Sequence, residues 1–134
     1  MVHIVDASVA IKWFIQETER DIALSVLQRI INKPKHFAVP ELFYFELAHA
    51  FNRLIKKPSP LQLHLLGQVT TFGIYRFSMT PELLSEVIYF QSLGLSGYDS
   101  AYIGLAKILK GKWITFDKKA HNTIEHLNLS ECLI

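Results

Sequence analysis

Short apolar runs alternate with longer amphipathic stretches along the whole chain. The runs at 2–5 and 113–115 cover only three or four positions, a length typical of buried strands. In the longer stretch at 18–32, apolar residues recur mainly at helical spacing. The predicted strands are residues 2–5, 36–39, 74–77, 113–115 and 132–133, and the predicted helices are residues 8–14, 18–32, 41–56, 60–72, 81–93, 96–110 and 118–126.

Polar residues mark the starts of several predicted helices. Ser59, with Gln62 three residues later, has the sequence of a capping box. Thr18 and Asp21 have a similar spacing, so a second capped helix is predicted to begin at Thr18. Pro34 cannot continue that helix and is predicted to end it.

The regular alternation of strand and helix is typical of right-handed crossovers and a parallel sheet covered on both faces. No linker, repeat or low-complexity segment interrupts it. We therefore predict a single α/β domain over residues 1–134, a three-layer sandwich. Its central, mainly parallel twisted sheet would have four to five strands flanked by helices. In open sheets of this kind, active sites lie beyond the carboxyl ends of the strands.

Four carboxylates occupy positions where an acid with a purely structural role would be poorly placed. Asp6 and Asp117 each follow an apolar predicted strand. Glu46 interrupts an apolar helical segment, and Asp99 opens a helix that is apolar along nearly its whole length. Because burying an unpaired carboxylate is costly, such acids are usually paired, neutralised or bound to metal. If the fold brings the four together, a divalent cation is their natural counter-charge.

Each of these acids also has a structural alternative. Asp6, Asp99 and Asp117 all lie at predicted helix starts, where a carboxylate is able to cap the helix. Glu46 lies on the same predicted helix as Arg53, and an exposed ion pair between them would contribute little to stability. Taken one acid at a time, the sequence leaves both interpretations open.

Three polar residues near the acids extend the candidate site. Ser8 is able to cap the first short helix, which would leave Asp6 free to bind a metal. In an extended chain, Thr115 points to the same side as the acid two positions later, so its hydroxyl is placed to bond a carboxylate or a metal-bound water. Arg53 is expected to orient Glu46 or to contact a phosphate.

Composition restricts the class of protein. The 134 residues are half apolar with a net charge of +2, which provides the core of one domain. A mean hydropathy of +0.21 is high for a soluble monomer and favours an oligomer or a binding partner. No apolar stretch approaches the roughly 18–20 residues that span a bilayer, and no signal-peptide pattern is present, so no membrane association is expected. With Cys132 as the single cysteine, a reducing cytoplasm is the expected compartment.

Positive charge is concentrated close in sequence to two of the acids. One interpretation is that these lysines form solvated helix ends, and the other is that they form a rim that attracts polyanions. The lysines considered are Lys56, Lys57, Lys107, Lys110, Lys112, Lys118 and Lys119, of which the last five lie near Asp99 and Asp117 in the sequence.

Other chemistries have little support in the sequence. The chain has no Gly-rich phosphate loop and no His-Glu-x-x-His pair. His49 and His64 are expected to pack on helix surfaces. Trp13 and the phenylalanine and tyrosine residues are expected to serve as core or interface anchors, not as platforms for base stacking.

Four segments, taken in order, resemble the motifs of PIN-domain proteins, especially the VapC-type toxins. Each motif is loose by itself, whereas four in the same order over nearly the whole chain are specific. The chain departs from the family pattern at Ser100, where alanine is usual, and at Trp113, where an aliphatic residue is usual. The segments are Val5–Trp13 (VDASVAIKW), Val39–Ala48 (VPELFYFELA), Leu95–Ala106 (LSGYDSAYIGLA) and Ile114–Lys119 (ITFDKK).

The resemblance implies a metal-dependent endoribonuclease that hydrolyses RNA phosphodiester bonds. Family members use Mg²⁺ or Mn²⁺, and the toxins are typically homodimers inhibited by a small antitoxin protein. We therefore expect the toxin of a type II toxin–antitoxin pair, and the alternative is a catalytically weak PIN-like module for RNA processing or protein binding. By the resemblance, the catalytic and metal-ligating residues would be Asp6, Glu46, Asp99 and Asp117, supported by Ser8 and Thr115.

Overall fold

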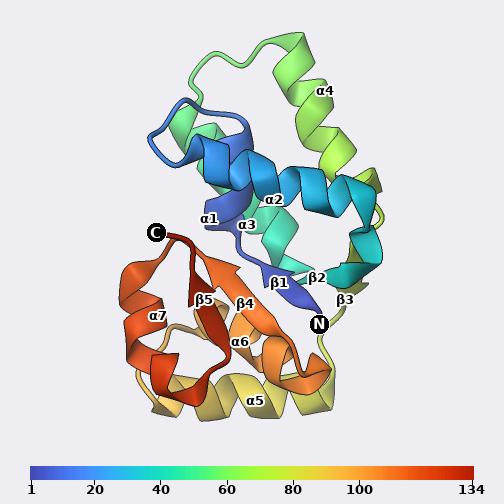
Figure 1. The fold of residues 1–134 in the computed structure, drawn as a ribbon. Helices are drawn as coiled ribbons and strands as arrows, with labels where there is room; N and C mark the ends of the chain where they lie inside the picture. The colour runs from blue at the N-terminus through green and yellow to red at the C-terminus, as the bar shows by residue number, and fades with distance from the viewer.

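All five predicted strands enter one sheet of the computed structural model, which describes all 134 residues (Figure 1). The strands are β1 (His3–Val5), β2 (Phe37–Pro40), β3 (Tyr75–Phe77), β4 (Lys112–Thr115) and β5 (Ser130–Cys132). They are ordered β3-β2-β1-β4-β5, and every neighbouring pair is parallel. The predicted parallel α/β class is therefore confirmed.

Helices form the two outer layers of the predicted sandwich. Figure 1 shows α1 to α4 on one side of the sheet and α5 to α7 on the other, and α6 contacts β1, β2 and β4 directly. No helix is both long enough and apolar enough to cross a bilayer. The helices are α1 (Ala7–Ala10), α2 (Arg20–Asn32), α3 (Leu42–Leu54), α4 (Pro60–Gln68), α5 (Pro81–Ser92), α6 (Gly97–Leu109) and α7 (Lys118–Ile124), and the 3-10 turns are η1 (Ile11–Trp13), η2 (Pro34–His36), η3 (Val69–Thr71) and η4 (Glu125–Leu127).

Local capping signals give mixed outcomes. The capping box of α4 is confirmed, because the Ser59 hydroxyl accepts from the Gln62 N–H at 3.0 Å and the Gln62 side chain accepts from the Ser59 N–H at 2.9 Å. The predicted cap at Thr18 is wrong, since α2 begins at Arg20 without a side-chain cap. Lys12 forms ion pairs with side chains of the segment that precedes α2, so a tertiary contact holds this turn instead.

The core is densest where α6 lies against the middle of the sheet. Every residue from Ser100 to Ala106 is buried, as the apolar sequence of this helix predicts. Trp113 of β4 is fully buried, and its ring stacks on Tyr102 of α6 with 5.8 Å between the ring centroids. The start of α6 is thereby held at a fixed position beside β1 and β4.

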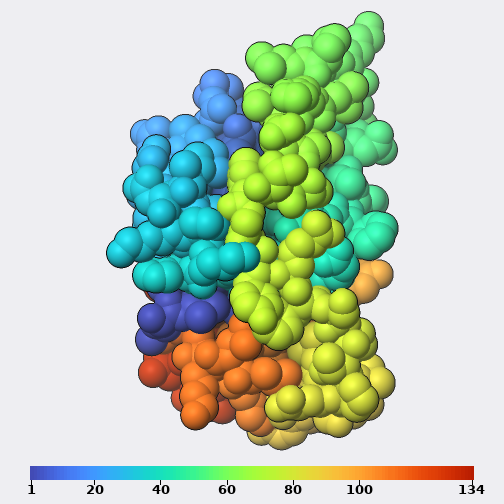
Figure 2. All heavy atoms as spheres, turned by 90° about the vertical axis from the view of Figure 1, so that its right-hand side faces the viewer, coloured from blue at the N-terminus to red at the C-terminus, as the bar shows by residue number.

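The α4 helix contrasts with this core. Together with η3 it forms a ridge on one face of the molecule (Figure 2), and none of its residues is buried. Leu61, Leu63 and Leu65 are all exposed on it. This surface accounts for part of the high mean hydropathy of the chain.

The sheet order reverses between β1 and β4. From β1 the chain continues to β2 and β3 on one side, whereas β4 and β5 lie on the other. At such a reversal, the segments that follow the two central strands diverge and leave a crevice beyond the carboxyl ends of the strands. The segments in question are α1 after β1 and α7 after β4.

The register between β1 and β4 brings the two strand ends level. Val5 lies opposite Ile114, and the Asp6 N–H donates to the Ile114 carbonyl at 3.1 Å. Gly111 permits the close approach at the other end of the pair, because a Cβ there would lie only 2.2 Å from the Val2 carbonyl oxygen. The close pairing places the residue after β1 beside the last residue of β4.

Candidate functional site

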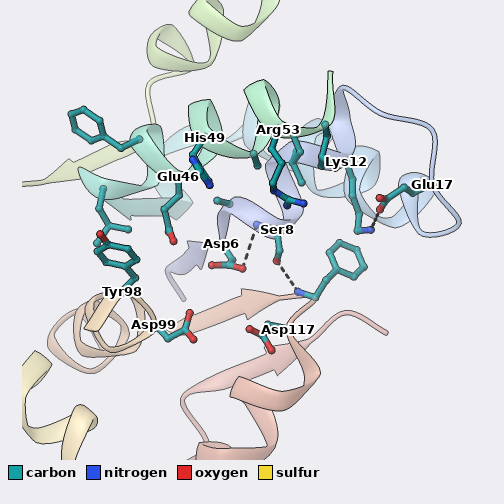
Figure 3. A pocket seen from close by; sticks show the side chains of 17 residues that line it. Asp6, Ser8, Lys12, Glu17, Glu46, His49, Arg53, Tyr98, Asp99 and Asp117 are labelled. Carbon is teal, nitrogen blue, oxygen red and sulfur yellow. Dashed lines mark hydrogen bonds and ion pairs between the residues drawn. The ribbon is translucent and has the colours of Figure 1, made fainter. Parts of the chain in front are cut away.

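A cleft of about 960 Å³ opens at the carboxyl ends of β1 and β4. Asp6, Glu46, Asp99 and Asp117 all line it, and each comes from a different element. Figure 3 shows Asp6 in the middle, with Glu46 on one side of it and Asp99 and Asp117 on the other. The structure thus brings together the four acids that the sequence analysis selected.

Asp6 is the most buried of the four, with an exposed fraction of 7%. Its Oδ2 accepts hydrogen bonds from the Thr115 hydroxyl at 2.9 Å and from the Ser8 N–H at 3.3 Å. Burial raises the pKa of Asp6, although these hydrogen bonds and the nearby Trp113 indole N–H oppose that shift. The indole N–H itself has no hydrogen-bond partner of good geometry. Asp6 therefore caps α1 and faces the cleft at the same time.

Ser8 and Thr115 connect the ends of the two central strands. The Thr115 hydroxyl, which is fully buried, donates its one proton to Asp6 and accepts from the Asp117 N–H at 2.9 Å. Because that proton is already used, the Ser8 hydroxyl must be the donor in its 3.3 Å contact with Thr115. The Ser8 oxygen also accepts from the Phe116 N–H at 3.0 Å. These bonds fix the position of Asp6 and of the backbone that carries Asp117.

Glu46 reaches the cleft from α3 and is held by a tyrosine. Its Oε1 accepts from the Tyr102 hydroxyl at 2.7 Å. Burial raises the pKa of Glu46 despite that bond, and the charges of Asp6 and Asp99 raise it further. Burial also raises the pKa of Tyr102 well above its ordinary value, so Tyr102 remains a hydrogen-bond donor.

Arg53 does not orient Glu46, contrary to one of the expectations from sequence. No ion pair joins the two, so the alternative of a surface pair on this helix is also wrong. The two residues lie seven positions apart on α3, and Glu46 is bonded to α6 instead. Arg53 is exposed, lines the cleft and forms no ion pair within the protein.

Asp99 is half-buried at the start of α6. Its backbone N–H donates to the Ser96 hydroxyl at 3.1 Å, which is one half of the predicted capping box, and no side-chain bond returns. Burial, followed by the charges of Asp6 and Asp117, raises the pKa of Asp99 to about 6. The nearby Ser96 side chain opposes this rise in the pKa only in part, so the Asp99 carboxylate is electrostatically unfavourable as an anion.

Asp117 is the most exposed of the four acids. Its Oδ1 accepts from the Ala120 N–H at 3.0 Å and caps α7. None of the four acids forms an ion pair with a lysine, arginine or histidine. The protein alone therefore leaves the four carboxylates without a directly paired counter-charge.

The spacing of the acids restricts the type of ion that fits them. No group of three or more His, Cys, Asp or Glu side chains is arranged closely enough to hold a metal ion by itself. A tightly ligated zinc ion requires such a group. Mg²⁺ keeps several of its waters and uses one or two carboxylates, and Mn²⁺ also favours oxygen ligands. The separated carboxylates of this cleft suit a hydrated ion of that kind.

Several other side chains of the cleft were not selected from the sequence. Lys12 pairs with Glu17 and Glu19 and lies over the Phe116 ring, 4.9 Å from its centroid. His49 is exposed on α3, as expected, and it also lines the cleft. Lys12 is a lysine within the apolar segment after β1, and that placement was the sequence signal for the part of the cleft that it lines.

Tyr102 was the other functional side chain that the sequence analysis did not assign to the site. It shares a helical face with Asp99 and is the one tyrosine within the buried part of α6. A hydroxyl in an otherwise apolar helix requires a hydrogen-bond partner, and that requirement was the available signal. The partner itself lies 56 positions away in the sequence.

Comparison with known proteins agrees with this architecture. The PIN domain family profile matches residues 3–125. A protein in a toxin–antitoxin complex from Klebsiella pneumoniae has a TM-score of 0.69 at 12% identity, with 98% of each chain covered. PAE2754 from Pyrobaculum aerophilum has a TM-score of 0.69 at 18% identity over 95% of this chain and 86% of its own.

A third similar structure is VapC20 from Mycobacterium tuberculosis, described as a Sarcin-Ricin loop cleaving toxin. It has a TM-score of 0.67 at 11% identity over 90% of this chain and 93% of its own. No curated protein sequence matches significantly. At these identities the structural likenesses concern the fold, whereas the family profile covers most of the sequence. The chain therefore belongs to the PIN domain family.

Proposed function

We propose that this protein is an endoribonuclease that hydrolyses RNA phosphodiester bonds with the help of Mg²⁺ or Mn²⁺. One observation carries the proposal: four carboxylates from four separate elements converge on one cleft without a basic partner. Such convergence costs stability, as the raised pKa values of Asp6, Glu46 and Asp99 indicate. A site of this kind is typical of chemistry that depends on a bound cation.

The proposed roles follow from the position of each side chain. Asp6, Asp99 and Asp117 would hold the ion directly or through water. When bound, the ion lowers the pKa of a coordinated water and neutralises charge on the phosphate. Glu46, oriented by Tyr102, is placed to position the attacking water and accept its proton, and its raised pKa makes it a better base near neutral pH.

The opposite wall of the cleft is suited to the RNA backbone. Arg53 lines the cleft with no ion pair of its own, so its guanidinium is available to a phosphate group. Lys12 lies on the same wall (Figure 3), where it is engaged by acids of the segment before α2. Arg53 thus provides unpaired positive charge next to the acidic centre, whereas the charge of Lys12 is balanced by Glu17 and Glu19.

We also propose that the protein is the toxin of a type II toxin–antitoxin pair, acting in the cytoplasm as a homodimer. The similar fold of the protein in the Klebsiella complex supports an antitoxin partner. The exposed leucines of α4 supply apolar surface for a partner or a second copy. Induced expression should arrest bacterial growth, and a small protein encoded beside the toxin should relieve the arrest and co-purify with it. Growth unaffected by active protein would restrict the proposal to a ribonuclease with another role.

Cleavage of RNA by purified, partner-free protein tests the enzymatic proposal directly. Mg²⁺ should support cleavage, EDTA should abolish it and Mn²⁺ should restore it. Asp6→Asn should reduce the rate by a factor of at least about 1,000, because it removes the central carboxylate. Arg76→Lys lies outside the cleft and serves as the control. Cleavage that survives both EDTA and Asp6→Asn would overturn the proposal.

A further inference from the structure

Two exposed aromatic side chains lie beside the acids of the cleft. Phe45 is 77% exposed and Tyr98 is 66% exposed, and both line the cleft. Phe45 directly precedes Glu46 on α3, and Tyr98 directly precedes Asp99 on α6. Two helices therefore present the same pair, an aromatic ring followed by a carboxylate, to one space.

Neither ring has a partner within the protein. Most other aromatic rings stack on a neighbouring ring or lie beneath a cation, whereas Phe45 and Tyr98 do neither. Because both rings line the cleft and neither is packed on another group, they present apolar faces to whatever enters it.

The cleft has different chemistry at its two ends. Figure 3 shows Lys12 and Arg53 toward one end and Tyr98 at the other, with Asp6 between them. Each nucleotide of an RNA strand carries a phosphate and a flat base, so an unpaired strand can offer phosphates to Arg53 and to an ion at the acids, and a base to the aromatic end. A protein partner would also cover these apolar faces, but the unpaired Arg53 toward the other end of the same cleft favours a polyanion.

We propose that Phe45 and Tyr98 form a stacking subsite for an unpaired nucleobase next to the phosphate that is cleaved. The inference rests on the proposed ribonuclease function and adds the two side chains that would contact the base beside the scissile phosphate. A base within a duplex is already stacked on both faces and cannot offer one to these rings. From the sequence, such aromatic residues were predicted to be anchors of the core or an interface, and the exposure of these two contradicts a role in the core.

Kinetics on a short single-stranded RNA and on the same sequence in a duplex test the subsite. Phe45→Ala and Tyr98→Ala should each raise KM for the single strand about tenfold, and the double variant about 100-fold, with much smaller changes in kcat. Tyr98→Phe keeps the ring and should behave as the unmodified protein. Tyr89→Ala removes an exposed aromatic side chain of α5 that lies outside the cleft, and it should change nothing.

Binding without cleavage separates this inference from the proposed function. A single-stranded oligonucleotide with one 2-aminopurine should lose fluorescence on binding to the protein in EDTA, and the double variant should abolish that quenching. Quenching that depends on Phe45 and Tyr98 in a protein that never cleaves RNA would support the subsite and overturn the ribonuclease. Cleavage with unchanged KM in the double variant would overturn the subsite alone.

One further outcome would assign the two rings to another partner. If the double variant binds and cleaves RNA normally but no longer binds the antitoxin that co-purifies with the unmodified chain, the rings form a protein contact and the inference is wrong. Thermal unfolding of each variant checks that the fold is intact. Because both side chains are exposed, the midpoints should stay close to that of the unmodified protein.

Discussion

Two glutamates close together in the chain have opposite environments. Glu41, just before α3, is paired on the surface with Arg76, and that hydrogen bond holds the pKa of Glu41 below its usual value. Glu46 faces the cleft from the same helix, where burial raises its pKa and the charges of Asp6 and Asp99 add to the effect. The side chains are identical, so the difference arises from what surrounds them.

The contrast distinguishes a structural acid from a functional one. In the surface pair, the guanidinium of Arg76 is the counter-charge of Glu41, so the pair requires no ligand. The cleft collects four carboxylates and supplies hydrogen bonds to hold them, but none of the four forms an ion pair with a basic side chain. We propose that an acid of the second kind is stabilised by a bound cation, and this difference can be measured by making the same change in both regions.

The largest difference is expected from replacing each glutamate with glutamine. Glu46→Gln removes the proposed base and should reduce kcat for RNA cleavage by about 100-fold or more. Glu41→Gln should leave kcat within about twofold, because its side chain is exposed and outside the cleft. Steady-state kinetics on one single-stranded RNA compares the two. Similar losses in both variants would remove the distinction between the regions.

A smaller effect is expected from the tyrosine that holds Glu46. Tyr102→Phe removes the 2.7 Å hydrogen bond and should lower kcat about tenfold. Because that bond lowers the pKa of Glu46, its loss should also move the acidic limb of the pH–rate profile to higher pH.

The surface region offers a matched control for this tyrosine. Tyr44 lies beneath Arg76, with 4.3 Å between the guanidinium carbon and the ring centroid. Tyr44→Phe keeps the ring and should leave both the rate and the pH profile unchanged. A pH profile that stays in place in Tyr102→Phe would show that Glu46 does not titrate in the rate-limiting step.

Much of the fold could be predicted because its signals are local. The strands and helices follow from apolar periodicity and from Pro and Gly, and the capping box of α4 depends on residues three positions apart. The start of α2 was predicted wrongly at Thr18 because the deciding contacts come from Lys12, outside that helix. Local sequence patterns therefore predict the helices and strands well, and they predict poorly the contacts from outside an element that hold it in place.

The candidate site divides in the same way. Asp6 and Asp117 were predictable, because residues that follow parallel strands share one edge of the sheet. The partner of Glu46 was not, since Tyr102 meets it only through the packing of α6 against the sheet. The exposure of Phe45 was likewise beyond the sequence, because a helix full of aromatic residues does not state which of them face water.

A still smaller effect is expected on the free energy of unfolding of the metal-free protein as the pH changes. The pKa of Asp99 is raised to about 6, so the folded state holds a proton that the unfolded state has released. Stability should therefore fall as pH rises from about 4 to about 6, with a loss on the order of 1 kcal/mol after allowance for partial exposure. Urea unfolding in EDTA at several pH values measures it.

Two additions to that experiment identify the cause. Asp99→Asn should stabilise the metal-free protein at neutral pH, because it removes a carboxylate that burial and the charges of Asp6 and Asp117 disfavour. Mg²⁺ should raise the stability of the unmodified protein at neutral pH and have less effect on the variant. Metal-free stability that increases through the same pH range would contradict the electrostatic account of the cleft.

The smallest effect, and one of opposite sign, belongs to the surface pair. Glu41→Gln should destabilise the protein by less than about 0.5 kcal/mol, because both partners are exposed and screened by solvent. The pKa of Glu41 is lowered, so its contribution is present above the ordinary value of 4.5 and is lost as pH falls through the lowered pKa. High salt should remove the difference between Glu41→Gln and the unmodified protein.

The two regions therefore predict opposite results at neutral pH without metal, a slight loss of stability for Glu41→Gln and a gain for Asp99→Asn. Destabilisation by both substitutions would mean that the cleft acids are satisfied within the protein and do not require a cation.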